Sequence, residues 1–118
     1  MKYLALIYST EGSGPEYGTP EFGAYMGAYQ KLNGTYTDEG VMLGGEALEP
    51  VNTATSVRVR DGQVETMDGP FAETKEQLGG FYMLDCPDLD AAIRYAAMIP
   101  TAAHGTVEIR PIMEINFE

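Results

Sequence analysis

Two segments of this chain, residues 2–9 and 79–86, alternate like β-strands yet are apolar on both of their faces. A strand of this kind must be covered on both sides, because neither of its faces can be left in water. The requirement for two covering layers constrains the fold more than any other feature of the sequence. In the first segment, one face carries Tyr3, Ala5 and Ile7, and the other carries Leu4, Leu6 and Tyr8. In the second segment, one face carries Phe81 and Met83, and the other carries Tyr82 and Leu84.

Two amphipathic helices are predicted to supply one of these layers. Thr19-Pro20-Glu21 is typical of a helix start, with Thr as N-cap, Pro at the first helical position and an acid near the positive end of the dipole. This helix is expected to end at Gly40, and a second helix to run from Pro87-Asp88, with Asp88 as N-cap, to Pro100. The expected buried stripes are Phe22, Tyr25, Met26, Tyr29, Leu32 and Tyr36 in the first helix, and Leu89, Ala92, Ile93, Ala96 and Ile99 in the second.

The remaining segments predict further strands. Residues 41–49 contain Gly44-Gly45, which indicates a bulge or a close approach of backbones. Residues 55–60 and 63–67 flank Asp61-Gly62, a two-residue hairpin signal. A last strand is expected over about residues 106–116.

The order β-α-β, hairpin, β-α-β predicts an α+β fold of the ferredoxin-like split βαβ type with an inserted β-hairpin. At 118 residues the chain has room for a single domain, 1–118. Two helices can cover only one face of such a sheet. We therefore expect the other apolar face to meet a second copy of the chain in a homodimer.

Composition excludes several classes of function. The chain has 18 acidic and 7 basic residues, and a net charge of −11 repels nucleic-acid phosphates and anionic membranes. One cysteine, Cys86, and one histidine, His104, leave no disulfide, no cysteine-based zinc site and no multi-histidine metal centre. Since nucleotide-binding motifs and long apolar runs are also missing, we expect no metal, no organic cofactor, no membrane span and a cytoplasmic location.

Residues 68–82, DGPFAETKEQLGGFY, carry the most specific motif of the chain. This run resembles the signature of the DGPF-domain branch of the YCII-related protein family, and residues 1–8, 53–62, 88–92 and 104–111 resemble other parts of the family in order. The resemblance implies a dimeric α/β barrel, two ferredoxin-like units packed sheet to sheet. It also implies a suspected active site with a His–Asp pair in a cleft, and an association of the branch with extracytoplasmic-function sigma factors.

Six residues are the candidates for a site. Asp68 matches the family's Asp and is one candidate catalytic residue. Residues 1–103 contain no histidine, so His104, the only histidine of the sequence, is the other. Each candidate also has a purely structural interpretation. Asp68 can cap a turn, His104 can be a surface residue, Lys75 can belong to a solvated loop, and Arg110 can pair with a facing acid. The candidate ligand-binding residues are Tyr8, Phe71, Lys75 and Arg110.

Two functions follow from these candidates. The first is a cofactor-free enzyme that acts on a small molecule in a cleft near the motif. The second is a ligand-binding or regulatory module, for which a basic partner such as a sigma-factor segment suits the acidic surface. If the cleft exists, Asp68, Phe71 and Lys75 should line one cavity, with Tyr8 or Arg110 within reach.

Overall fold

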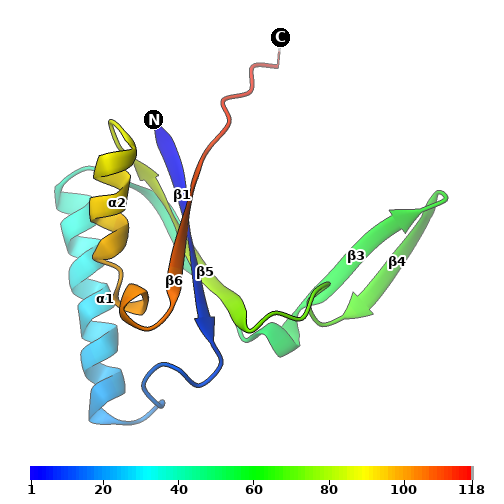
Figure 1. Ribbon diagram of the computed structural model, residues 1–118, viewed down its shortest axis with the longest axis horizontal. Helices are drawn as coiled ribbons and strands as arrows, with labels where there is room; N and C mark the ends of the chain where they lie inside the picture. The colour runs from blue at the N-terminus through cyan, green and yellow to red at the C-terminus, as the bar shows by residue number, and fades with distance from the viewer. Residues whose placement is uncertain (118) are drawn as a thin grey trace.

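A four-stranded antiparallel sheet with two helices on one face forms the body of the protein (Figure 1). The computed structural model describes residues 1–117. The sheet order β2-β5-β1-β6 and the α+β composition are compatible with the predicted ferredoxin-like split βαβ arrangement. The elements are β1 (Lys2–Thr10), α1 (Pro20–Asp38), β2 (Met42–Ala47), β3 (Thr55–Arg60), β4 (Gln63–Asp68), β5 (Glu76–Asp85), α2 (Leu89–Ala97) and β6 (Thr106–Pro111), with short 3₁₀ turns η1 (Val51–Thr53) and η2 (Pro100–Ala103).

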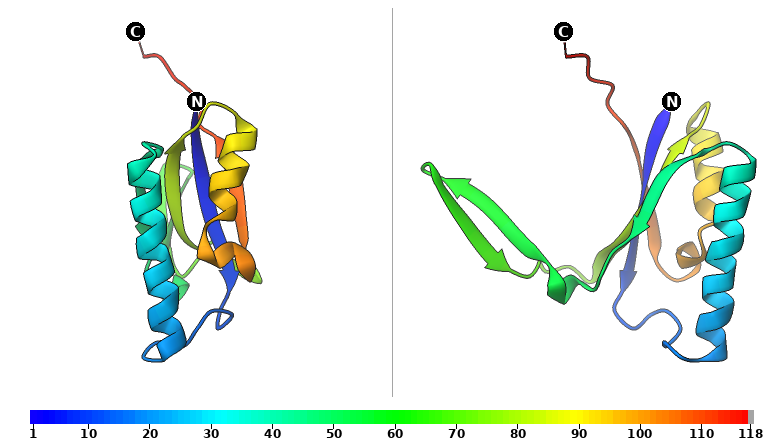
Figure 2. Two further views of the ribbon diagram at one scale, coloured as in Figure 1. Left: turned by 90° about the vertical axis from the view of Figure 1, so that its left-hand side faces the viewer. Right: turned by 180° about the vertical axis from the view of Figure 1, so that it is seen from behind.

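The central strands β1 and β5 have the two apolar faces that the sequence predicts. Tyr3 pairs with Leu84, and both side chains are buried under the helices. On the other face Leu6 pairs with Phe81, and no helix of the described chain lies over them (Figure 2). The side chains of this open face are therefore only half-buried. The open face is the apolar surface of β1 and β5 formed by Leu4, Leu6, Tyr8, Phe81 and Met83.

Both helices begin as the sequence predicts. Thr19 Oγ1 accepts a hydrogen bond from the Phe22 N–H at 3.2 Å, and an Asp88 carboxylate oxygen accepts one from the Ala91 N–H at 2.8 Å. After α1 the chain turns at Gly40, whose φ of 71° favours glycine. Neither α1 nor α2 is long and apolar enough to cross a membrane.

The predicted stripe of α2 is partly wrong. Leu89 and Ile93 are 50% and 49% exposed. The helix is instead rotated so that Ala91, which the pattern did not include, faces the sheet with Ala92. Alanines let a helix backbone lie close to a sheet, so the two larger side chains remain at the margin of the contact. In α1, Met26 is 49% exposed, whereas Leu32 and Tyr36 are buried as predicted.

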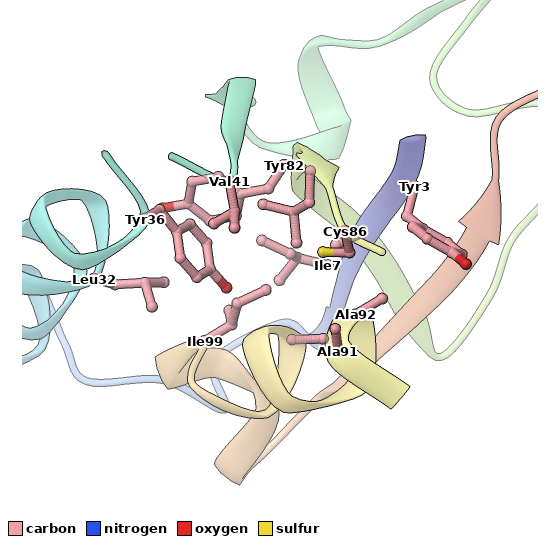
Figure 3. Close-up of a cluster of buried hydrophobic side chains, with 13 residues drawn as sticks. Tyr3, Ile7, Leu32, Tyr36, Val41, Tyr82, Cys86, Ala91, Ala92 and Ile99 are labelled. Atoms are coloured by element: carbon pink, nitrogen blue, oxygen red, sulfur yellow. The ribbon is translucent and has the colours of Figure 1, made fainter. Parts of the chain in front are cut away.

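The core lies between the helices and the sheet (Figure 3). Tyr36 is at its centre with no exposed surface, and its hydroxyl donates a hydrogen bond to the Tyr95 carbonyl oxygen at 2.5 Å. Its ring packs edge-on against Tyr82. Burial raises the pKa of the Tyr36 hydroxyl, and Cys86 is buried in the same core. The core consists of Tyr3, Ala5, Ile7, Leu32, Tyr36, Val41, Tyr82, Leu84, Cys86, Ala91, Ala92, Ala96 and Ile99.

The predicted hairpin is an arm, formed by β3 and β4, that projects away from the sheet on the side opposite the helices (Figures 1 and 2). Its turn is Asp61-Gly62, and both residues have positive φ, 52° and 75°. The arm raises the radius of gyration to 16.5 Å, compared with roughly 13 Å for a compact chain of about this length. Val57, Val59 and Val64 share one face of the arm and are 62%, 59% and 70% exposed.

Three predicted strand boundaries are corrected by the pairing. β6 ends at Pro111 rather than at residue 116, because the Ile112 N–H bonds to the Lys2 carbonyl and β1 has no residue left to pair beyond it. β5 begins three residues earlier than predicted, because Glu76 and Gln77 pair with the end of β1. β2 covers only Met42–Ala47, and its register shifts at Gly44, as the glycine pair indicates.

Candidate functional site

Two cavities meet at the end of the sheet where β1 finishes and β5 begins. One, of about 570 Å³, lies against the loop Asp68–Phe71, which we call the DGPF loop. The other, of about 360 Å³, contains His104. The two are adjacent, because six residues line both of them, and we call the pair the groove: Leu48, Glu49, Pro50, Val51, Gln77 and Leu78.

The DGPF loop is fixed by bonds to the start of the arm. Gly69 has a φ of 93°, which only glycine adopts without strain, and its N–H bonds to the Ala54 carbonyl at 2.7 Å. The Ser56 hydroxyl donates to the Gly69 carbonyl at 2.8 Å. These bonds direct Pro70 and Phe71 into the wall of the groove, where Phe71 is 75% exposed.

Tyr8 is the one predicted residue that connects the others. It lines the groove together with Phe71, and it also lines a neighbouring cavity of about 820 Å³ together with Lys75. In the cavity of about 820 Å³, the Thr106 hydroxyl donates to a Glu76 carboxylate oxygen at 3.0 Å. The structure thus brings Tyr8 to both Phe71 and Lys75, but these two residues line different cavities.

Asp68 and Arg110 lie outside these cavities. Asp68 is exposed at the end of β4, opposite Thr55. Its carboxylate accepts no hydrogen bond within residues 1–117, so the backbone bonds expected of a turn-capping residue are not formed. Arg110 is exposed on β6 and pairs with Glu108 of the same strand at 3.5 Å, not with an acid of the facing strand.

His104 is held from both sides of its ring. Its Nδ1 lies 3.1 Å from the Ser13 hydroxyl, and its Nε2 lies 3.3 Å from the Tyr25 hydroxyl. Ser13 comes from the loop after β1 and Tyr25 from α1, so three separate segments fix the orientation of one imidazole. Glu11 and Glu49 line the same part of the groove and give it a negative charge.

The hydrogen bonds continue from His104 into the interior. The Tyr25 hydroxyl makes a short hydrogen bond with Thr101 Oγ1, and the Tyr29 hydroxyl lies 2.6 Å from the same oxygen. Thr101 is only 5% exposed. Burial raises the pKa of Tyr29 to about 12, so this phenol remains protonated at neutral pH.

Sequence reasoning missed three residues of this network: Ser13, Tyr25 and Thr101. The pattern assigned Tyr25 to helix packing, and it gave Ser13 and Thr101 no role. Helical periodicity identifies which residues face the sheet, but it does not show which residue a tyrosine hydroxyl reaches with its hydrogen bond. Within the described chain, no three His, Cys, Asp or Glu side chains come together as a metal site would require.

Comparison with known proteins gives two matches. The profile of the YCII-related domain matches residues 1–116. An uncharacterised protein from Rhizobium meliloti (strain 1021) is 35% identical over 114 residues, which span 95% of this chain and 92% of that protein. Both matches therefore extend over the sheet, the helices and the arm together.

Proposed function

The chain belongs to the YCII-related family, and on that premise we propose that it is an enzyme that acts on a small molecule in the groove between the DGPF loop and His104. The observation that supports the proposal is the set of residues shared by the two cavities, because it brings an aromatic binding surface and the only histidine into neighbouring cavities. The cavity of about 570 Å³ beside the DGPF loop has the size and the mainly apolar lining of a small-molecule site.

The acid–base role in this proposal belongs to His104. Histidine is the side chain that ordinarily exchanges a proton near neutral pH, and positioned acid–base groups contribute on the order of 10²–10⁴ to a rate. Tyr25 holds Nε2 from the helix side, so Nδ1 is the nitrogen that a substrate reaches once the Ser13 hydroxyl, which lies on an exposed loop, moves aside. With Glu11 and Glu49 nearby, the substrate is neutral or cationic. Phe71 and Tyr8 would hold its apolar part.

One observation favours the alternative, a ligand-binding or regulatory module. Both ring nitrogens of His104 already have hydrogen-bond partners within the chain. A histidine with no free nitrogen orients a binding surface without exchanging protons with a ligand. A module of this kind would use the same groove, and a basic partner such as a sigma-factor segment would suit the net charge of −11.

We also propose that the working form is a homodimer arranged as an α/β barrel. Two apolar surfaces of the chain lack a cover of their own: the open face of the sheet and the valine face of the arm. An isolated two-stranded hairpin is at best marginally stable in water, so the arm needs a packing partner. A second copy of the chain would cover both surfaces at once, with the two sheets packed face to face.

The test begins with a thermal-shift screen of uncharged and cationic metabolites, since a bound ligand raises the melting temperature by mass action. Compounds that bind are then offered as substrates to the wild type and to His104→Gln. We expect Phe71→Ala to abolish the shift, whereas Phe117→Ala, which removes an even more exposed ring outside the groove, leaves it unchanged.

For the enzyme, His104→Gln should lower turnover by about 10²–10⁴-fold and change the Kd little. Tight binding without turnover in the wild type would establish the module instead. Binding that is unaffected by Phe71→Ala would show that the groove is not the site.

A further inference from the structure

A separate cavity of about 380 Å³ lies between α1 and the edge of the sheet at β2 and β5; we call it the α1 cavity. Small residues create its floor. On the helix-facing side of the sheet, Ala47 pairs with Gly80 and Gly80 pairs with Ile7, so Ile7 is the only large side chain in this row. Its roof is formed by three residues on one face of α1: Met26, Tyr29 and Asn33.

The backbone around the cavity is too close to accept larger side chains. A Cβ atom at Gly45 would lie 2.7 Å from the Tyr82 ring, and one at Gly80 would lie 2.9 Å from the Glu46 carbonyl oxygen. The Tyr82 ring is in turn held by its hydroxyl, which donates to Asn33 Oδ1 at 2.5 Å. The empty volume is therefore a fixed feature of the β2–β5 pair and not a gap that a neighbouring side chain closes.

The lining defines the chemistry of a ligand. The walls are mainly apolar and include Met26 and Met42, and no lysine or arginine of the described chain lines the cavity. Because no cationic side chain lines it, the cavity disfavours anions. At about 30 Å³ for each water in the liquid, the volume corresponds to roughly a dozen waters, which is ample room for a monocyclic molecule.

Tyr29 supplies the polar contact, and the direction of its hydrogen bond depends on His104. When His104 Nε2 is an acceptor, the Tyr25 hydroxyl donates to it, Thr101 donates to Tyr25, and Tyr29 donates to Thr101. When Nε2 carries a proton, every bond reverses. Thr101 then donates to Tyr29, and the Tyr29 proton is free to point into the cavity.

We propose that the α1 cavity is a second binding site, for a small uncharged molecule that presents a carbonyl oxygen to Tyr29, and that the hydroxyl chain couples its occupancy to His104. A ligand that accepts the Tyr29 proton favours the reversed direction of the chain and therefore the form of His104 that carries a proton on Nε2. Coupling of this kind is reciprocal, so the state of His104 in the groove also sets the affinity of the α1 cavity.

The experiment uses acetophenone as the carbonyl probe, with ethylbenzene as its counterpart without an acceptor and benzoate as its anionic counterpart. Binding is followed on the full-length protein by NMR. Because His104 is the only histidine, its two imidazole ¹⁵N signals report its tautomer without overlap. At a pH where the imidazole is neutral, acetophenone should move these signals toward the Nε2–H tautomer, and ethylbenzene should not.

We expect acetophenone to bind about two- to tenfold more tightly than ethylbenzene, which corresponds to one net hydrogen bond, and benzoate to bind most weakly. Tyr29→Phe should remove the preference for acetophenone. Tyr17→Phe, which changes a tyrosine that is 89% exposed and outside the cavity, should retain it. Thr101→Val interrupts the hydroxyl chain and should abolish the response of His104 to acetophenone, and Tyr25→Phe interrupts the same chain at a more exposed residue.

Several outcomes would overturn the proposal. One is equal binding of acetophenone and ethylbenzene to the wild type, and another is an unchanged preference in Tyr29→Phe. Absence of saturable acetophenone binding at millimolar concentration would also exclude the site. A His104 response that persists in both Thr101→Val and Tyr25→Phe would disprove the coupling. None of these results depends on what binds in the groove.

Discussion

Gly105 packs against the backbone of Tyr8 so closely that a Cβ atom on residue 105 would lie 2.2 Å from the Tyr8 carbonyl oxygen. The next residue, Thr106, pairs with Tyr8 in the sheet. This contact fixes the turn that carries His104 against the strand that carries Tyr8. It therefore joins the two ends of the groove through the backbone.

Gly105→Ala should destabilise the protein by roughly 1–3 kcal/mol, because the neighbouring atom is backbone and cannot move aside as a flexible side chain can. The matched control is Gly27→Ala in α1, where a Cβ atom meets nothing within 4 Å. That variant should be more stable than the wild type by about 0.5–1 kcal/mol. Urea unfolding measures both, and equal effects would contradict the close packing at Gly105.

Asp68→Ala should change the free energy of unfolding by less than about 0.5 kcal/mol, because its carboxylate makes no hydrogen bond within the described residues. Asp88→Ala removes the N-cap of α2 and should cost about 0.5–2 kcal/mol. Denaturant unfolding of the two variants compares the same substitution in two environments. A large loss in Asp68→Ala would mean that Asp68 has a structural partner, for example in a dimer.

Stability should fall as the pH rises from about 10 to about 12. Burial raises the pKa of Tyr29 from 10.0 to about 12, so the unfolded chain, whose tyrosines ionise near pH 10, loses its protons first. The contribution of protonated Tyr29 to the free energy of unfolding is fully present below about pH 10 and is lost as the pH rises above it. Tyr29→Phe should therefore show a smaller decline in urea midpoint over this range than Tyr17→Phe. Identical declines in the two variants would contradict the burial of Tyr29.

Sedimentation velocity should show a particle of twice 12.8 kDa at micromolar concentration. Leu6→Lys, on the open face, should convert it to a monomer, because a charge cannot be buried there without a partner. Leu89→Lys, at the exposed margin of α2, is the control and should remain dimeric. A monomeric wild type would exclude the homodimer.

The fold could be predicted from the sequence wherever a local pattern determines it. The alternation in β1 and β5, the caps Thr19 and Asp88, and the Asp61-Gly62 turn each depend on neighbouring residues, and the structure confirms all of them. The position of the last strand's end was wrong, since it depends on how far β1 extends and not on the sequence of β6 itself.

The candidate site was less predictable, because its contacts join distant segments. His104 bonds to Ser13 and Tyr25, which precede it by 91 and 79 residues, and no local pattern relates them. Asp68 and Phe71 are close in sequence, yet only Phe71 lines the groove, because the left-handed turn at Gly69 separates the directions of the two segments. Tyr8 and Phe71 line the same cavity, although they are 63 residues apart in the sequence.

The central position of β1 determines the order in which the protein can fold during synthesis. Tyr3 pairs with Leu84 and with Pro111, so β1 leaves the ribosome well before both of its partners and has no neighbour in the sheet until β5 emerges. At about 5–20 residues per second, the 81 residues from Tyr3 to Leu84 take about 4–16 s. The arm needs only adjacent residues, and hairpins form in about 1–10 μs. Throughout those seconds the two-sided apolar strand remains unpaired, so its apolar side chains are exposed on the nascent chain.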